Sequence, residues 1–132
     1  MRALAAVFGL LLVTGCFLDS PTDPAPIDQQ LTLAPGQSAS IEGTSLSLKF
    51  IGVTGDNRCP ADVVCILGGS ATVKVQVAAA SGGPRELTFE TGDLKPIVFD
   101  SWTLELVQLQ PYPFSAQPIQ PGDYRATLRI QR

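Results

Sequence analysis

The stretch TVKVQVAAASGGPRELTFE (residues 72–90) decides the fold class, because two runs of alternating apolar and polar residues flank a glycine-rich segment. Every second residue from Val73 to Val77 is a valine, and Leu87 and Phe89 alternate with polar residues in the second run. A period of two with one apolar face is typical of a half-buried antiparallel strand. The SGGP between the runs has the composition of a turn. This stretch therefore predicts β-structure.

The same alternation recurs along most of the chain after residue 38. Strands are expected at 31–33, 38–42, 46–50, 72–77, 85–90, 96–100, 102–106 and 124–130. Frequent turn signals separate these runs, and no amphipathic helical run follows the N-terminal segment. The pattern predicts one all-β domain over residues 31–132, a small antiparallel sandwich with Greek-key-like connections. A small barrel is the alternative that the pattern leaves open.

The N-terminal segment MRALAAVFGLLLVTGC (residues 1–16) begins with Arg2 followed by an apolar run. This is the pattern of a secretory signal peptide, and the run is shorter than the about 20 residues that a spanning helix needs. Its end, Val-Thr-Gly-Cys, resembles the lipobox of bacterial lipoproteins. The resemblance implies that residues 1–15 are removed and that Cys16 becomes the first residue. Acyl chains such as palmitate on Cys16 would then anchor the protein to a membrane.

Residues 16–30 are expected to form a tether between the lipid and the folded domain. This segment is rich in proline and aspartate, a composition that favours an extended spacer without a core of its own. In enterobacteria an aspartate directly after the lipidated cysteine retains a lipoprotein at the inner membrane, whereas Phe17 stands there in this chain. We therefore expect the protein at the bacterial cell envelope, at the outer membrane facing the periplasm if the source has two membranes.

The two remaining cysteines, Cys59 and Cys65, are expected to form a structural disulfide. The cell envelope permits disulfides. A zinc site as a rule has four ligands, yet the chain has no histidine, and redox pairs usually have a two-residue spacing instead of five. The sequence thus indicates no metal and no cofactor. Closing so short a loop contributes about 2–2.5 kcal/mol in the chain-entropy model.

The segment around these cysteines is similar to a group of small, uncharacterised bacterial lipoproteins and secreted proteins with a D-x-R-C-P…C…G-x-A motif. The matching residues are Asp56, Arg58, Cys59, Pro60, Cys65, Gly69 and Ala71. The downstream L-x-P-x-P (109–113) and D-Y-x-A-x-L-x-I (123–130) segments match as well, so the resemblance covers most of residues 31–132. Leu67 stands where a tryptophan is expected, so the role of that aromatic is lost or moved. The resemblance implies no activity, because the group has none established.

Composition excludes several function classes. Of 9 basic side chains one, Arg2, lies in the signal peptide; the remaining 8 against 12 acidic ones give a net charge of −4, without general attraction for nucleic acid. The absence of histidine excludes Ser-His-Asp and Cys-His catalysis. Glu86 and Glu90 share a strand face at a backbone separation of about 13 Å, too far for a glycosidase pair. We therefore expect no enzyme.

Four residues are candidates for contact with a partner, and each has a structural alternative. Asp56 and Arg58 lie in the stapled loop (residues 55–69), where an Asp56–Arg58 contact that supports the loop is the favoured interpretation. Tyr112 and Phe114 lie in the Pro-rich loop (residues 110–122). Their rings either face a partner or fold over the open end of the core. We expect Phe114 to cover the core and Tyr112 to be the contact residue.

Arg125 and Arg129 share the polar face of the last expected strand. Such a basic stripe either binds an acidic partner or pairs across strands with Glu86 or Glu90, and cross-strand pairing is the favoured interpretation.

The sequence as a whole predicts a lipid-anchored, non-enzymatic binding or structural module of the cell envelope. Its partners are expected to be the membrane, through Cys16, and an envelope protein or glycan. The alternative is an inhibitor of secreted hydrolases, either a protease or lysozyme, because a small disulfide-stapled sandwich presents loops that fit an active-site cleft.

Overall fold

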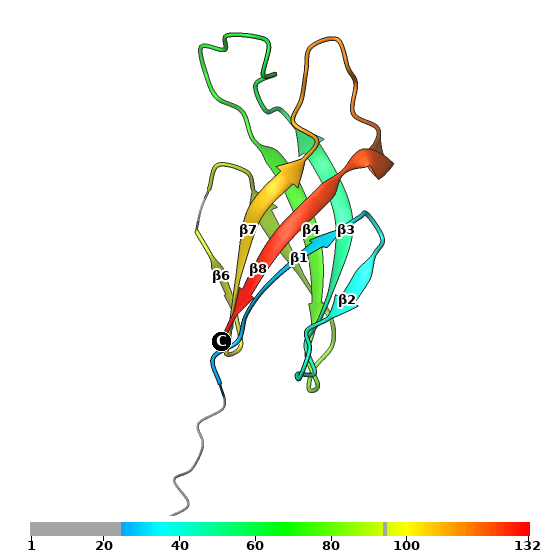
Figure 1. Ribbon diagram of the computed structural model, residues 1–132, viewed down its shortest axis with the longest axis vertical. Helices are drawn as coiled ribbons and strands as arrows, with labels where there is room; N and C mark the ends of the chain where they lie inside the picture. The colour runs from blue at the N-terminus through cyan, green and yellow to red at the C-terminus, as the bar shows by residue number, and fades with distance from the viewer. Residues whose placement is uncertain (1–24, 94) are drawn as a thin grey trace, which may run out of the picture.

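Eight strands stack in two antiparallel sheets in the computed structural model, which describes residues 25–93 and 95–132 (Figure 1). The strands are β1 (Asp28–Leu33), β2 (Ser38–Ser40), β3 (Ser47–Asp56), β4 (Ala71–Ala78), β5 (Arg85–Glu90), β6 (Ile97–Phe99), β7 (Trp102–Gln110) and β8 (Arg125–Gln131), with a short 3-10 turn at Pro121–Asp123. The expected signal peptide, Cys16 and most of the expected tether lie outside the described residues. Within these residues, no helix is long and apolar enough to cross a membrane.

One sheet has the order β1-β8-β7-β6 and the other the order β2-β3-β4-β5. The expected all-β sandwich is confirmed, and the barrel alternative is excluded because no pair among the described strands joins the two sheets. The connectivity is nevertheless simpler than the expected Greek key. Apart from β1, which pairs with β8, the neighbours within each sheet are consecutive strands, and the chain changes sheets after β1 and after β5. The strands form an up-and-down meander folded into two layers.

The core lies between the two sheets and contains the apolar face of each expected strand. Val73, Val75 and Val77 of β4 are fully buried, as are Leu128 and Ile130 of β8. Successive side chains of a strand point to opposite faces, so the alternation in the sequence places the apolar set inward. Each such side chain contributes about 1.5–3 kcal/mol when it is fully buried.

Two strands extend further than the alternation predicts. β3 continues to Asp56 and β7 continues to Gln110, and both contain register shifts of the kind caused by β-bulges. The shift between Leu106 and Gln108 exchanges the two faces of β7, so that Leu109 is buried. Because the alternation of apolar and polar residues changes phase at this bulge, the sequence pattern does not reveal that β7 continues to Gln110. It also brings Asp56 and Leu109 to the same end of the sandwich.

The first strand begins at Asp28, so Asp28–Gln30 of the expected tether belong to the sheet. Arg129 donates through Nε to the Asp28 carboxylate at 2.8 Å and also forms an ion pair with it. The expected pairing of Arg129 with Glu86 or Glu90 is wrong, because β8 lies between β1 and β7 while β5 is in the other sheet.

The two ends of the sandwich differ. The two longest connections, between β3 and β4 and between β7 and β8, extend from one end (Figure 1). The C-terminus and the start of β1 lie at the opposite end. An N-terminal anchor would therefore attach at the end away from these long loops.

Candidate functional site

The stapled loop leaves the sandwich between β3 and β4. Cys59 and Cys65 form the expected disulfide, with an S–S distance of 2.05 Å and a Cα–Cα distance of 6.0 Å. The bond closes a small ring within the loop, too short to enclose a core of its own. The side chains carried by this ring must therefore pack against a neighbouring segment or face solvent.

Arg58 lies at the base of the stapled loop and is only 8% exposed. Its guanidinium donates two hydrogen bonds to the Asp56 carboxylate, from Nε at 2.8 Å and from Nη2 at 2.6 Å. It also donates to the carbonyl oxygens of Leu109 and Pro111, each at 3.0 Å. Arg58 thus connects the stapled loop to the beginning of the Pro-rich loop. Its guanidinium carbon lies 5.5 Å from the centre of the Tyr112 ring.

Asp56 receives a further hydrogen bond from the hydroxyl of buried Tyr124, at 3.0 Å. The hydrogen bonds from Arg58 hold the pKa of Asp56 below its usual value, and the neighbouring carboxylate raises that of Arg58. Burial, followed by the contact with Asp56, raises the pKa of Tyr124. These contacts occupy Asp56 and most of the Arg58 donors. The interpretation of Asp56 and Arg58 as a structural pair agrees with this geometry.

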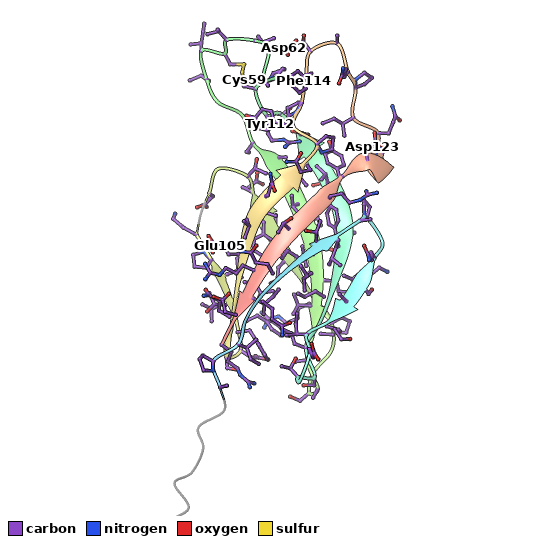
Figure 2. The ribbon with its side chains drawn as sticks, viewed as in Figure 1. Cys59, Asp62, Glu105, Tyr112, Phe114 and Asp123 are labelled. Carbon is purple, nitrogen blue, oxygen red and sulfur yellow. A yellow bond between two sulfur atoms is a disulfide. The ribbon has the colours of Figure 1, made fainter. Side chains whose placement is uncertain are left out.

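The stapled loop and the Pro-rich loop also bind each other further out. The Ala61 N–H donates to the Pro113 carbonyl at 2.9 Å. The Ser115 N–H donates to Asp62 at 2.9 Å, and the Ser115 hydroxyl donates to the same carboxylate, whose pKa these bonds lower. Figure 2 shows Cys59, Asp62 and Phe114 close together at this end of the molecule. Each loop therefore restrains the other.

Gly69 closes the base of the stapled loop against Asn57. A Cβ atom at Gly69 would overlap the Asn57 carbonyl, whereas at Gly68 it would meet no atom within 4 Å. Two residues further on, Ala71 is fully buried at the start of β4. The glycine and the alanine of the G-x-A segment thus occupy positions where larger side chains do not fit.

The outer part of the stapled loop exposes four large apolar side chains, which we name the apolar tip. Their exposed fractions are 44% for Val63, 99% for Val64, 100% for Ile66 and 84% for Leu67. Single exposed apolar residues are ordinary, whereas four within five consecutive positions form an unusual feature of this loop. The signal in the sequence was the run VVCIL (residues 63–67), which continues past Cys65, the end of a disulfide ring too small to bury it.

The aromatic residues of the Pro-rich loop remain about half exposed, at 52% for Tyr112 and 47% for Phe114. The expectation that Phe114 covers the core is wrong. Ile119 of the same loop packs against the core instead. The bonds of Pro113 and Ser115 to the stapled loop hold Phe114 outside the sandwich.

The two loops at this end contain no free basic side chain, although Arg125 lies at the same end, where β8 begins opposite Gln110. Neither residues 59–73 nor residues 96–124 contain lysine or arginine, and the charge of Arg58 is balanced by Asp56. Within residues 25–93 and 95–132, no three acidic or cysteine side chains gather as a possible metal site. A mostly apolar pocket of about 270 Å³ is lined by Tyr112, Arg58, Leu106 and Leu109, among other residues. The surface is therefore apolar and weakly acidic.

Comparisons with known protein families, with curated proteins and with solved structures found no match. The fold and the site by themselves define the class, a two-sheet β-sandwich in which a disulfide-stapled loop presents an apolar tip.

Proposed function

We propose that this chain is a lipid-anchored, non-enzymatic binding module of the bacterial cell envelope, with the apolar tip as its contact surface. The observation that carries the proposal is the exposure of Val63, Val64, Ile66 and Leu67 on a braced loop. Exposed apolar groups of this kind are stabilised when a partner covers them, at about 25 cal/mol per Å² of apolar surface.

The bracing of the loop supports a role in binding. The disulfide, the Asp62–Ser115 contact and the Arg58 hydrogen bonds restrain the loop before any partner arrives. A restrained loop loses less conformational entropy on binding than a mobile one, so more of its contact energy appears as affinity. Tyr112 and Phe114 add exposed aromatic rings at the same end of the molecule, and aromatic residues are enriched among those that dominate binding energy.

The lipid anchor rests on the lipobox-like segment that ends at Cys16. An anchor there agrees with the arrangement of the sandwich, because β1 begins at the end opposite to the apolar tip (Figure 1). The tip would face away from the membrane that holds the lipid. It would thus be accessible to proteins of the surrounding compartment.

A site-specific photo-crosslinking experiment tests the contact surface. A photoreactive amino acid is placed at Val64 in the apolar tip, or at Val98 on β6, which is 71% exposed and serves as the control. We expect a discrete crosslinked product in cells from position 64 and none from position 98. Equal crosslinking from both positions, or none from position 64, contradicts the proposal.

A further inference from the structure

We infer that the apolar tip occupies the substrate cleft of a secreted peptidase, which makes this protein a loop-insertion inhibitor. The inference rests on the proposed function and deepens it, because it names the class of partner. It follows from the shape, backbone, side chains and charge of the stapled loop.

The backbone of the tip is free to bind a cleft. Within the described part of the chain, residues 64–69 form no backbone hydrogen bond, although β3 and β4 are paired on both sides of the loop. Receptor sites for peptides commonly pair with the free main chain of the ligand as an added strand and read alternate side chains in pockets. A convex loop with unpaired N–H and C=O groups fits such a cleft.

The side chains of the tip fit apolar pockets. Val64 and Ile66 stand on either side of Cys65 and are almost completely exposed, while Leu67 adds a third large group. The run VVCIL contains no polar side chain. Clefts of glycosidases and lysozyme are built around carboxylates and sugar hydroxyls. The side chains of the tip offer such a cleft no complementary donor, whereas they match a peptidase that accepts apolar residues.

Charge and shape disfavour two other occupants. Binding to anionic lipid headgroups is favoured by lysine and arginine, and residues 59–73 and 96–124 contain neither. A second copy would bring two convex tips together, and such a contact is too small for the roughly 1,200–2,000 Å² of a stable interface. A concave, uncharged protein site remains.

The disulfide protects the part of the loop up to Cys65 against the consequences of cleavage, whereas Ile66 and Leu67 follow the ring. A cut after Val63 or Val64 would fall inside the Cys59–Cys65 ring, so the two new ends would stay linked. The Ala61–Pro113 and Asp62–Ser115 hydrogen bonds hold one side of the ring, and the β3–β4 pairing holds its base. The products of a cut inside the ring would stay covalently linked, and that part of the loop would remain in the cleft.

The inference is tested with the detergent-solubilised full chain against elastase, papain, thermolysin and pepsin, one peptidase of each mechanistic class, and against lysozyme. We expect inhibition of at least one peptidase with an inhibition constant on the order of 1 µM or below, as for a specific complex. Val64→Asp together with Ile66→Asp should weaken that inhibition by about tenfold or more, because charged groups replace apolar ones in the pockets. Val98→Asp, which places the same charge at an apolar residue of β6 that is 71% exposed, should leave it unchanged.

Three results overturn the inference: no inhibition of any of the four peptidases, inhibition of lysozyme alone, or cosedimentation of the unlipidated Cys16→Ser protein with phosphatidylglycerol vesicles that Val64→Asp abolishes. A melting curve of each variant confirms that it is folded, and Ile66→Ser serves as a second, uncharged variant. Crosslinking from position 64 to a protein that is not a peptidase would refute only the inference. Absence of crosslinking from that position would refute the proposed function as well.

Discussion

At the scale of single residues, the contacts among Asp56, Arg58 and Tyr124 explain how two long loops are held over the end of the sandwich. The Asp56 and Arg58 side chains are 13% and 6% exposed, so their ion pair is largely shielded from water. The D-x-R spacing already indicated this pair. The hydrogen bond from Tyr124 was hidden in the sequence because 68 positions separate it from Asp56.

Asp56→Asn should reduce the free energy of unfolding by about 2 kcal/mol, because Arg58 then keeps its charge without a counter-ion. Tyr124→Phe removes only the hydroxyl contact and should reduce it by about 1 kcal/mol. Urea denaturation of both variants measures these differences. A stable Asp56→Asn protein would show that the pair does not support the loops.

The lowered pKa of Asp56 predicts loss of stability in acid. Because the folded-state pKa lies below the unfolded one, the contribution is complete above the unfolded value and disappears as pH falls through the folded value. The free energy of unfolding should therefore decline below about pH 4. Asp56→Asn should show a shallower decline between pH 5 and pH 2 in the same denaturation series, with Asp28 and Asp62 responsible for the remainder. An identical slope in both proteins would contradict the assignment.

Gly69→Ala should disrupt the base of the stapled loop, because the added Cβ overlaps the backbone carbonyl of Asn57. We expect a loss of about 1–3 kcal/mol, as for other overpacked positions. Gly68→Ala is the matched control and should change stability by less than about 0.5 kcal/mol, since open space surrounds that position. Thermal unfolding of the two variants measures the difference. Equal melting temperatures would mean that the close approach is not required.

At the scale of elements, the stapled loop and the Pro-rich loop form one unit at the end of the sandwich. Both β3 and β7 continue past their bulges, so the two loops begin at the same end of the sandwich. The hydrogen bonds from Ala61 to Pro113 and from Ser115 to Asp62 then join them. A change in either loop is therefore expected to affect the other.

Replacement of both Cys59 and Cys65 by serine should reduce the free energy of unfolding by about 2 kcal/mol, because the unfolded chain regains the freedom that the bond removes. The melting temperature should fall on the order of 10 °C. Differential scanning calorimetry measures the change, with dithiothreitol-treated native protein as the parallel sample. Two titratable thiols in the untreated native protein would contradict the disulfide.

At the scale of the whole molecule, the arrangement separates the proposed anchor from the proposed contact surface. β1 begins at one end of the sandwich and the apolar tip lies at the other (Figure 1). An N-terminal anchor would then attach at one end of the sandwich, and a partner would bind the tip at the other end. Binding at the tip would not require the protein to leave its membrane.

Exported wild-type protein should incorporate radiolabelled palmitate and enter the detergent-rich phase on Triton X-114 partitioning. Cys16→Ser should do neither, because two or more acyl chains on Cys16 supply the stable membrane affinity. Both proteins should have the same melting temperature, since Cys16 precedes the folded domain. Export of wild-type protein without label would refute the lipid anchor.

The sequence by itself determined the β-class, the inward face of the five strands with clear alternation up to their bulges, and the pairing of Cys59 with Cys65. These properties are local: the pleat makes side chains alternate, and the chain offers few other uses for two thiols. Only the tertiary structure decided the meander order of the strands, the exposure of Phe114 and the protrusion of the apolar tip. Those depend on contacts such as Ser115–Asp62, between residues 53 positions apart, and on bulges that change the phase of β3 and β7. An alternating pattern records which side of a strand is apolar, but it contains no information about which distant loop will cover a given residue.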